Sequence, residues 1–311
     1  MTNDRRLILA ASTGGHLTQL VKLAPFLSAS PESLWISFDS PQSRSLLREK
    51  NFLPVPYIAP RDFKSVGTAY RLIRQHLKNF GANYEEAVST GAALALAALP
   101  AARMSGVEAR YIESVSRTEG PSLSGRILHA SRLCALETQH ASWAGGRWKP
   151  RESVMQAFTA ARDKAPNPHP KLFVTLGTIS PYRLDSLVDA VLSTGLANET
   201  TTWQLGSTQR TDLPGRCYET VEDSQFEQMV RGSDVVITHS GVGSILKILE
   251  TGKFPVVIPR RRERGEHVDD HQLQIAKLVH DSGIAVSVEA PLLDAELIVD
   301  ASSWTVRSRG A

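Results

Sequence analysis

The sequence feature that most constrains the fold is a glycine-rich turn at residues 239–244, which reads His-Ser-Gly-Val-Gly-Ser. A mainly apolar run at 234–238 precedes it, and apolar residues at helical spacing follow it. This order is typical of a buried strand, a tight turn and the start of a helix. Unpaired backbone N–H groups and the helix dipole at this turn favour the binding of an anion, and glycine lets a phosphate approach the backbone. The alternative is that the glycines serve only the tight turn. The candidate binding residues are His239, Ser240, Gly241, Gly243 and Ser244.

Similar polar clusters follow two other predicted strands. A strand predicted at 254–258 is followed by a helix whose polar start includes His271 and Gln272. Gly177 and Thr178 follow another predicted strand. Because strand ends and helix starts of an open parallel sheet lie on one rim, where such sheets bind ligands, we predict that these residues share a site.

Strand and helix patterns alternate along the whole chain, which indicates parallel sheets with helices on both faces. Each half begins with a strand, a turn containing glycine and threonine, and a helix. Between the halves, residues 165–170 read Ala-Pro-Asn-Pro-His-Pro, which is typical of a linker. We predict an α/β fold of two doubly wound, Rossmann-like domains, residues 1–164 and 165–311, that face each other across a cleft.

Composition is consistent with this fold and excludes some functions. A chain of 311 residues is long enough for two domains, and 41% hydrophobic with 22% charged residues is typical of a soluble globular protein. The net charge of +3 does not indicate nucleic-acid binding. Cys134 and Cys217 lie far apart in apolar surroundings, so we expect two buried thiols and a reducing compartment.

We expect no segment that crosses a membrane. The longest run of small apolar residues, 91–102, is interrupted by Pro100 and is too short, and the N-terminal apolar segment reads as the first strand rather than a signal peptide. Residues 65–80 predict an amphipathic helix with basic residues on or beside its polar face. This helix either packs on the sheet as an ordinary surface helix or docks on an anionic membrane.

The first half contains its own candidate site residues. Gly14, Gly15 and His16 open the first predicted helix, where a neutral imidazole can accept a proton near pH 7 or can simply cap the helix. Glu113 and Glu119 bracket a loop rich in serine, glycine and proline, and are alternative bases. The turn at His16 lacks the third glycine of the dinucleotide fingerprint, which disfavours an NAD-dependent dehydrogenase.

Motifs in both halves resemble a known family. The run ITHSGVGSILKILETGKFPVVIPRRRERGEHVDDHQLQIA resembles the donor-binding domain of the GT-B glycosyltransferases of family 28, especially the dolichol-linked N-acetylglucosaminyltransferases and their bacterial relatives in exopolysaccharide assembly. The first half, with ASTGGHLTQL and YIESVSRTEGPSLSGRIL, is similar to the partner subunit of those two-part enzymes. The chain therefore resembles a fusion of the two subunits.

The resemblance implies an inverting enzyme that moves a sugar from a UDP-sugar to a polyprenyl-diphosphate-linked saccharide, in cell-surface polysaccharide or glycolipid assembly. Such an enzyme is cytoplasmic and peripheral on the inner face of the cell membrane. The resemblance also implies that His16 is a base or contacts the acceptor, and that His271 and Gln272 hold sugar hydroxyls. We assign Gly14 and Gly15 to donor binding as well. Because glycine turns can offset the charge of the departing diphosphate and no Asp-X-Asp motif ends a strand, we expect no obligatory metal and no cofactor.

One position departs from the family pattern. Many such donor sites carry a glutamate on the helix after the glycine turn, and Lys247 stands there instead. Glu250 shares a helix face with it and is the candidate for the ribose contact, with Lys247 as an alternative contact to phosphate. The Arg-rich run at 260–264 is either a solvated loop or a phosphate contact, and the absence of interleaved aromatic residues disfavours nucleic acid.

Two other functions stay open. The first is a UDP-sugar epimerase of the same fold, which needs no acceptor. The second is a non-catalytic nucleotide-sugar-binding subunit, in which Lys247 marks a site that has lost its function.

Overall fold

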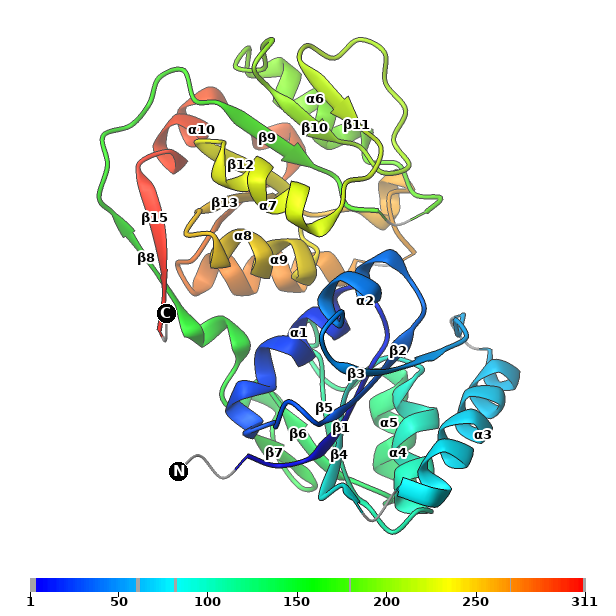
Figure 1. Cartoon of the computed structure of the whole chain (residues 1–311). Coiled ribbons are helices and arrows are strands. Elements are labelled where there is room, and N and C mark those ends of the chain that lie inside the picture. The colour runs from blue at the N-terminus through cyan, green and yellow to red at the C-terminus, as the bar shows by residue number, and fades with distance from the viewer. Residues whose placement is uncertain (1–3, 60–61, 81–82, 179, 269, 310–311) are drawn as a thin grey trace. The chain divides into compact units, whose positions relative to one another are not determined.

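The structure is a computed structural model that describes residues 4–59, 62–80, 83–178, 180–268 and 270–309, with backbone only at 79, 80 and 271. The chain divides into two compact units, Met1–Val154 and Met155–Ala311 (Figure 1). Each unit is built around a parallel sheet. The α/β fold with two Rossmann-like units is therefore confirmed.

The first unit contains a seven-stranded parallel sheet in the order β3-β2-β1-β4-β5-β6-β7. Its strands are β1 (Leu7–Ala11), β2 (Leu34–Phe38), β3 (Asn51–Val55), β4 (Glu86–Gly91), β5 (Glu108–Ile112), β6 (Ala135–Thr138) and β7 (Trp148–Pro150). Its α-helices are α1 (Gly15–Leu23), α2 (Pro41–Leu46), α3 (Phe63–Phe80), α4 (Ala95–Arg103) and α5 (Leu123–Ser131).

Helices cover both faces of the first sheet because successive side chains of a strand point to opposite faces. Ile8 and Ala10 of β1 share one core with residues of α3 and α4, among them Ile73. Leu7 and Leu9 point the other way and are also buried, on the face where α1 contacts β1. Helix α3 is amphipathic as predicted.

The second unit contains a six-stranded parallel sheet in the order β11-β10-β9-β12-β13-β14 and a separate two-stranded ribbon of β8 and β15. The strands are β8 (Phe158–Arg162), β9 (Leu172–Thr175), β10 (Thr202–Gln204), β11 (Arg216–Tyr218), β12 (Val235–His239), β13 (Pro255–Ile258), β14 (Val286–Ser287) and β15 (Trp304–Ser308). The α-helices are α6 (Asp185–Ser193), α7 (Asp223–Arg231), α8 (Val242–Glu250), α9 (His271–Asp281) and α10 (Ala295–Ala301).

The second sheet is also buried on both faces. Phe173 and Val236 point to the face where Phe226 of α7 and Ile248 of α8 complete a core cluster. Leu172 and Val174 of β9 alternate with Phe173 and are buried on the other face. Continuous apolar strands of this kind are typical of a parallel sheet.

Several details differ from the sequence predictions. The predicted linker at 165–170 lies inside the second unit, because β8 precedes it and pairs antiparallel with β15. Cys134 is buried as predicted, but Cys217 is exposed because it lies on the edge strand β11. No helix within the described ranges is both long enough and apolar enough to cross a membrane.

Candidate functional site

Two glycine turns meet at one edge of the second sheet. Strands β9 and β12 pair directly, and Thr175 lies opposite Thr238 in their register. The chain leaves β9 through Gly177 and leaves β12 through Ser240, so the two turns are neighbours at the carboxyl ends of adjacent strands. The chain continues from β9 to its neighbour β10 and from β12 to its neighbour β13, so the two connections run in opposite directions along the sheet. Open parallel sheets bind ligands at this kind of edge.

The His239 side chain separates the two turns. A Cβ added to Gly177 would lie 2.5 Å from Cε1 of His239, and one added to Gly241 would lie 2.2 Å from its Nε2. Gly177 also has a φ of +76°, which a residue with a Cβ adopts only with strain. Burial, together with the charges of Arg260 and His267, lowers the pKa of His239 to about 3. A neutral imidazole therefore sets the spacing between the turns.

The turn after β12 leads into helix α8, which begins at Val242 with Gly241 as its N-cap and no side-chain cap. The first N–H groups of a helix have no partner within the helix, so they can bind an anion. Gly243 and Ser244 lie in this first turn and are half-buried. The hydroxyl of Ser240 is buried, and among the described residues it has no hydrogen-bond partner. A ligand oxygen at this helix start would satisfy it.

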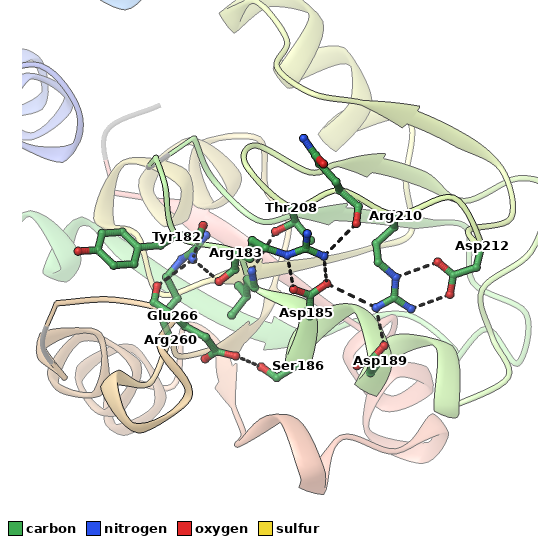
Figure 2. A network of polar contacts seen from close by, with 12 residues as sticks. Tyr182, Arg183, Asp185, Ser186, Asp189, Thr208, Arg210, Asp212, Arg260 and Glu266 are labelled. Atoms are coloured by element: carbon green, nitrogen blue, oxygen red, sulfur yellow. Dashed lines mark hydrogen bonds and ion pairs between the residues drawn. The ribbon is translucent and has the colours of Figure 1, made fainter.

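Arg260, the second residue after β13, holds the surrounding loops in place (Figure 2). Its side chain is 1% exposed. Nη2 donates to the carbonyl of Leu176 at 2.6 Å, and Nη1 donates to the carbonyls of Tyr182, Arg183 and Glu266 at 3.0–3.2 Å. Burial lowers the pKa of Arg260 to about 10, so it is still cationic at neutral pH. It thereby links the turn that contains Gly177 to the loop before α9.

The rest of the Arg-rich run is not a uniform solvated loop. Arg261 and Arg264 form ion pairs with Glu289 at 2.7 Å and 2.8 Å, whereas Arg262 is exposed. The prediction of a phosphate contact is thus wrong for the Arg260 side chain, which donates to backbone carbonyls inside the protein.

Of the two candidates at the start of α9, one is described. Gln272 uses its Oε1 to accept the backbone N–H of Arg260 at 3.1 Å, so part of its amide already serves the fold. The side chain of His271 lies outside the described residues. Its role as a contact of the donor sugar stays a prediction.

The helix residues discussed for the ribose differ in environment. Lys247 forms an ion pair with Asp223 of α7 at 2.6 Å and lies 5.7 Å from the ring centroid of Phe226. It is therefore held toward α7, which disfavours the alternative that it contacts a phosphate. Glu250 is exposed in the last turn of α8.

A cavity of about 940 Å³ opens at the β9–β11 part of the same edge. Its lining includes Ser180, Arg183, Gly206, Ser207, Arg210 and Tyr218. Gly206 is directly behind the first glycine turn, because a Cβ on it would lie 2.1 Å from the carbonyl oxygen of Gly177. The volume is in the range of small-molecule sites.

Ion pairs hold the loops that form this cavity (Figure 2). Arg183 pairs with Asp185 at 2.7 Å, and Arg210 pairs with both Asp189 and Asp212 at 2.6 Å. The bond to Asp189 joins the loop after β10 to helix α6. These side chains therefore shape the cavity wall.

The first unit contains a second cluster, around His16, at the carboxyl ends of β1, β4 and β5. Nδ1 of His16 lies 2.7 Å from the carbonyl oxygen of Thr90. Since a carbonyl can only accept, Nδ1 carries the proton and Nε2 keeps its lone pair. Burial lowers the pKa of His16, the bond to Thr90 opposes this, and the charge of Arg117 adds to it. Gly91 allows the ring to approach, because its Cβ would lie 3.0 Å from Cε1 and Nδ1 of His16.

The glycines before His16 lie in the turn between β1 and α1. Gly14 has a φ of +85° and is the N-cap of α1. Its N–H donates to Oε1 of Gln42 at 2.6 Å, and its carbonyl oxygen accepts from Nε2 of Gln42. Gly15 is the first residue of the helix and is half-buried. Their assignment to donor binding stays a prediction.

The two carboxylates proposed as alternative bases differ. Glu113 is 1% exposed, and its oxygens accept four hydrogen bonds from Tyr111, Ser114 and Ser122. Burial raises the pKa of Glu113, while these donors oppose the rise. It holds the loop together, which disfavours it as a base. Glu119 is exposed on that loop.

Sequence reasoning missed Arg260 and Gly206 as site residues. Arg260 was grouped with a charged run, and only its place two residues after a buried strand hinted at burial. Gly206 carried a clearer signal, because Leu-Gly-Ser-Thr at 205–208 resembles the Leu-Gly-Thr at 176–178 that contains Gly177. In the part of the chain that the structure describes, no group of three histidine, cysteine, aspartate or glutamate side chains is placed to hold a metal ion.

Comparison with known families gives one match. Residues 179–295 match the glycosyltransferase family 28 C-terminal domain. This segment contains the turn at Ser240, helix α8, Arg260 and Gln272. No curated protein matches the sequence.

Solved structures extend the likeness to nearly the whole chain. MurG of Acinetobacter baumannii has a TM-score of 0.57 at 14% identity, over 96% of this chain and 94% of that chain. UGT2 of Phytolacca americana, solved with UDP-2-fluoro-glucose and pterostilbene, has a TM-score of 0.54 at 12% identity, over 97% and 89%. UDP-GlcNAc 2-epimerase of Methanocaldococcus jannaschii has a TM-score of 0.55 at 10% identity, over 98% and 93%. At these identities the likeness establishes the fold, which is GT-B, and the family match supports a glycosyltransferase.

Proposed function

We propose that this chain is an inverting, metal-independent glycosyltransferase that moves a sugar from a UDP-sugar to a polyprenyl-diphosphate-linked saccharide. The observation that carries the proposal is the pair of glycine turns closed on His239, of which the second turn and His239 itself lie within the segment that matches the family 28 domain. The product belongs to cell-surface polysaccharide or glycolipid assembly.

The second unit supplies what a departing UDP needs. The turns at 177–178 and at 240–244 lie at one edge of the sheet, and a diphosphate bound there is stabilised by the free N–H groups and the dipole at the start of helix α8. The buried hydroxyl of Ser240 adds one donor. This arrangement offsets the negative charge that develops as the bond between the anomeric carbon and the phosphate oxygen breaks.

The first unit supplies the base in this proposal. Nε2 of His16 accepts the proton of the acceptor hydroxyl while that oxygen attacks the anomeric carbon from the side opposite UDP, which inverts the centre. The bond from Nδ1 to the carbonyl of Thr90 holds the ring in the required tautomer.

A lipid-linked acceptor requires work at a membrane surface, and helix α3 fits this role. Its outer face presents Lys64, Arg71 and Lys78 together with Leu72, which is 43% exposed. Basic residues beside an exposed apolar side chain favour an anionic bilayer. We place the enzyme on the cytoplasmic face of the cell membrane, and the first unit takes the part of the partner subunit in a natural fusion of two proteins.

The test is an incubation of the purified full chain with a panel of labelled UDP-sugars and a lipid-extract acceptor, with and without EDTA. We expect one UDP-sugar to label the lipid fraction, the label to depend on the lipid, and EDTA to leave the rate unchanged. Loss of transfer in EDTA that added Mg²⁺ restores would contradict the metal-independent mechanism.

The same incubation separates the two alternatives. A UDP-sugar epimerase is favoured by the similarity to the UDP-GlcNAc 2-epimerase structure and would convert a UDP-sugar with no lipid present. A non-catalytic subunit would bind a nucleotide in calorimetry and yield neither product.

A further inference from the structure

The cavity at the β9–β11 part of the second sheet is walled by one long loop, residues 205–215, which is fastened at both ends. At its start the N–H of Gly206 donates to the carbonyl of Glu219 at 2.8 Å. Near its end the carbonyl of Pro214 accepts from Nε1 of the buried Trp203 at 2.8 Å. A wall held in this way exists before a ligand arrives, so binding costs little ordering entropy.

The arginines of the cavity wall are already paired (Figure 2). Arg183 directs Nε and Nη2 to the two carboxylate oxygens of Asp185 at 2.7 Å and 2.8 Å. Arg210 directs Nε and Nη2 to Asp212 at 2.8 Å and 2.6 Å, and Nη1 to Asp189 at 2.6 Å. Because a guanidinium binds phosphate through the same fork, neither arginine presents a free fork to an anion.

The net charge of the wall also disfavours an anion. Glu219 lines the cavity and is exposed. Together with Asp185, Asp189 and Asp212 it sets four carboxylates against two guanidinium groups, so the wall repels phosphate. A metal ion is disfavoured as well, because among the described residues no three histidine, cysteine, aspartate or glutamate side chains are placed to hold one.

Four residues of the lining offer neutral polar groups. These groups are the hydroxyls of Ser180, Thr211 and Tyr218 and the side-chain amide of Gln209, and within the part of the chain that the structure describes none of them has a hydrogen-bond partner. Hydroxyls and amides both donate and accept, and the carboxylate of Glu219 accepts. Tyr218 also brings a half-buried aromatic ring. This set matches a ligand that carries many hydroxyl groups and no charge.

We propose that this cavity binds a neutral oligosaccharide through its hydroxyl groups, at a site separate from the donor turns. The volume of about 940 Å³ lies near the upper end of the range for small-molecule sites, so it suits a disaccharide better than a single sugar. The proposed reaction directs the diphosphate to the start of α8, which follows β12, whereas the cavity lies at β9, β10 and β11. The inference follows from the wall alone and does not depend on the proposed reaction.

The test is saturation-transfer NMR on the purified full chain, with cellobiose, lactose, maltose and N,N′-diacetylchitobiose as probes. We expect at least one disaccharide to bind with a Kd of roughly 1–10 mM, and added UDP to change that Kd by less than about twofold. Glu219→Gln removes a charged acceptor and should raise the Kd roughly tenfold or more, and Tyr218→Phe removes one hydroxyl and should raise it roughly 2- to 10-fold. Glu199→Gln removes the same charge from an exposed position outside the lining and should behave like the wild type.

Several outcomes would overturn the proposal. One is that none of the four disaccharides binds, and another is that neither Glu219→Gln nor Tyr218→Phe changes the Kd, because the sugar then binds elsewhere. Displacement of the disaccharide by UDP would assign the cavity to the nucleotide, and displacement by inorganic pyrophosphate or by spermidine would assign it to an ion. Circular dichroism confirms that each variant is folded before it is titrated. Absence of sugar transfer in the wild type would refute the proposed function and leave this binding measurement unaffected.

Discussion

Replacing Arg260 by methionine should strongly destabilise the second unit. The side chain is 1% exposed and donates to four backbone carbonyls from separate parts of the chain. A hydrogen bond from a charged group is worth about 1.5–3 kcal/mol net, and methionine has a similar length but no donor. Four such values do not add, because the loops relax and water reaches some carbonyls. Each buried carbonyl left without a donor costs about 1–3 kcal/mol, and with this partial relaxation we expect a total loss of about 3–5 kcal/mol.

Urea unfolding measures this loss. Circular dichroism follows both units, and Trp203, which is fully buried in the second unit, adds a local fluorescence probe. The Arg260→Met transition assigned to the second unit should move to lower urea, with the first unit unchanged. Arg262→Met removes an exposed charge two residues away and should change the free energy of unfolding by less than about 0.5 kcal/mol. Arg260→Lys should fall between them, because one ammonium cannot reach all four carbonyls. A loss below about 1 kcal/mol in Arg260→Met would show that the carbonyls do not depend on this side chain.

Three further changes test the site. His16→Ala should lower kcat by about 10²- to 10⁴-fold and leave the Kd for UDP unchanged. His169→Ala, which changes an exposed histidine, should alter neither kcat nor Kd. A wild-type rate in His16→Ala would exclude His16 as the base. The pKa of His239 in the folded state is about 3, below its usual value of 6.5. Between these pH values only the unfolded state gains a proton. The free energy of unfolding should therefore fall by up to about 1.4 kcal/mol per pH unit as the pH drops from 6.5 toward 3. Urea unfolding at pH 7 and pH 4.5 should show a smaller decrease in the free energy of unfolding for His239→Asn than for the wild type. Equal decreases in the two proteins would refute the low pKa of His239. Gly241→Ala should lose about 1–3 kcal/mol of stability and weaken UDP binding, because its Cβ would lie 2.2 Å from Nε2 of His239. Adding His239→Ala should recover part of that stability, and strictly additive losses would contradict the contact.

The fold was predictable from the sequence because the strands of a parallel sheet are buried on both faces and therefore read as continuous apolar runs. The runs at β9, β12 and β13 are of this kind, and glycine marks the turns that follow the first two. Strands β7, β8 and β15 were missed because they lie at edges or in a ribbon, where polar residues such as Lys149 and Arg307 are tolerated.

The site was predictable where it depends on the backbone and not where it depends on side-chain partners. A glycine turn after a buried strand can be recognised locally, so Gly177 and Gly241 were found. The contact of His239 with Gly177 and the bond from Arg260 to Leu176 each join segments more than 60 residues apart. No local sequence pattern predicts such contacts. Glu113 was taken for a candidate base because it borders a loop rich in serine, glycine and proline, whereas four hydrogen bonds hold its carboxylate in the fold.

The ribbon of β8 and β15 has a practical consequence for engineering the second unit. Phe158 lies opposite Ser308, and the N–H of Arg309 donates to the carbonyl of Ala157. The first and last strands of this unit therefore run side by side, and a short linker would join them. A circular permutant could be opened in the exposed stretch around 211–212, which would leave every strand of the six-stranded sheet and both glycine turns uninterrupted.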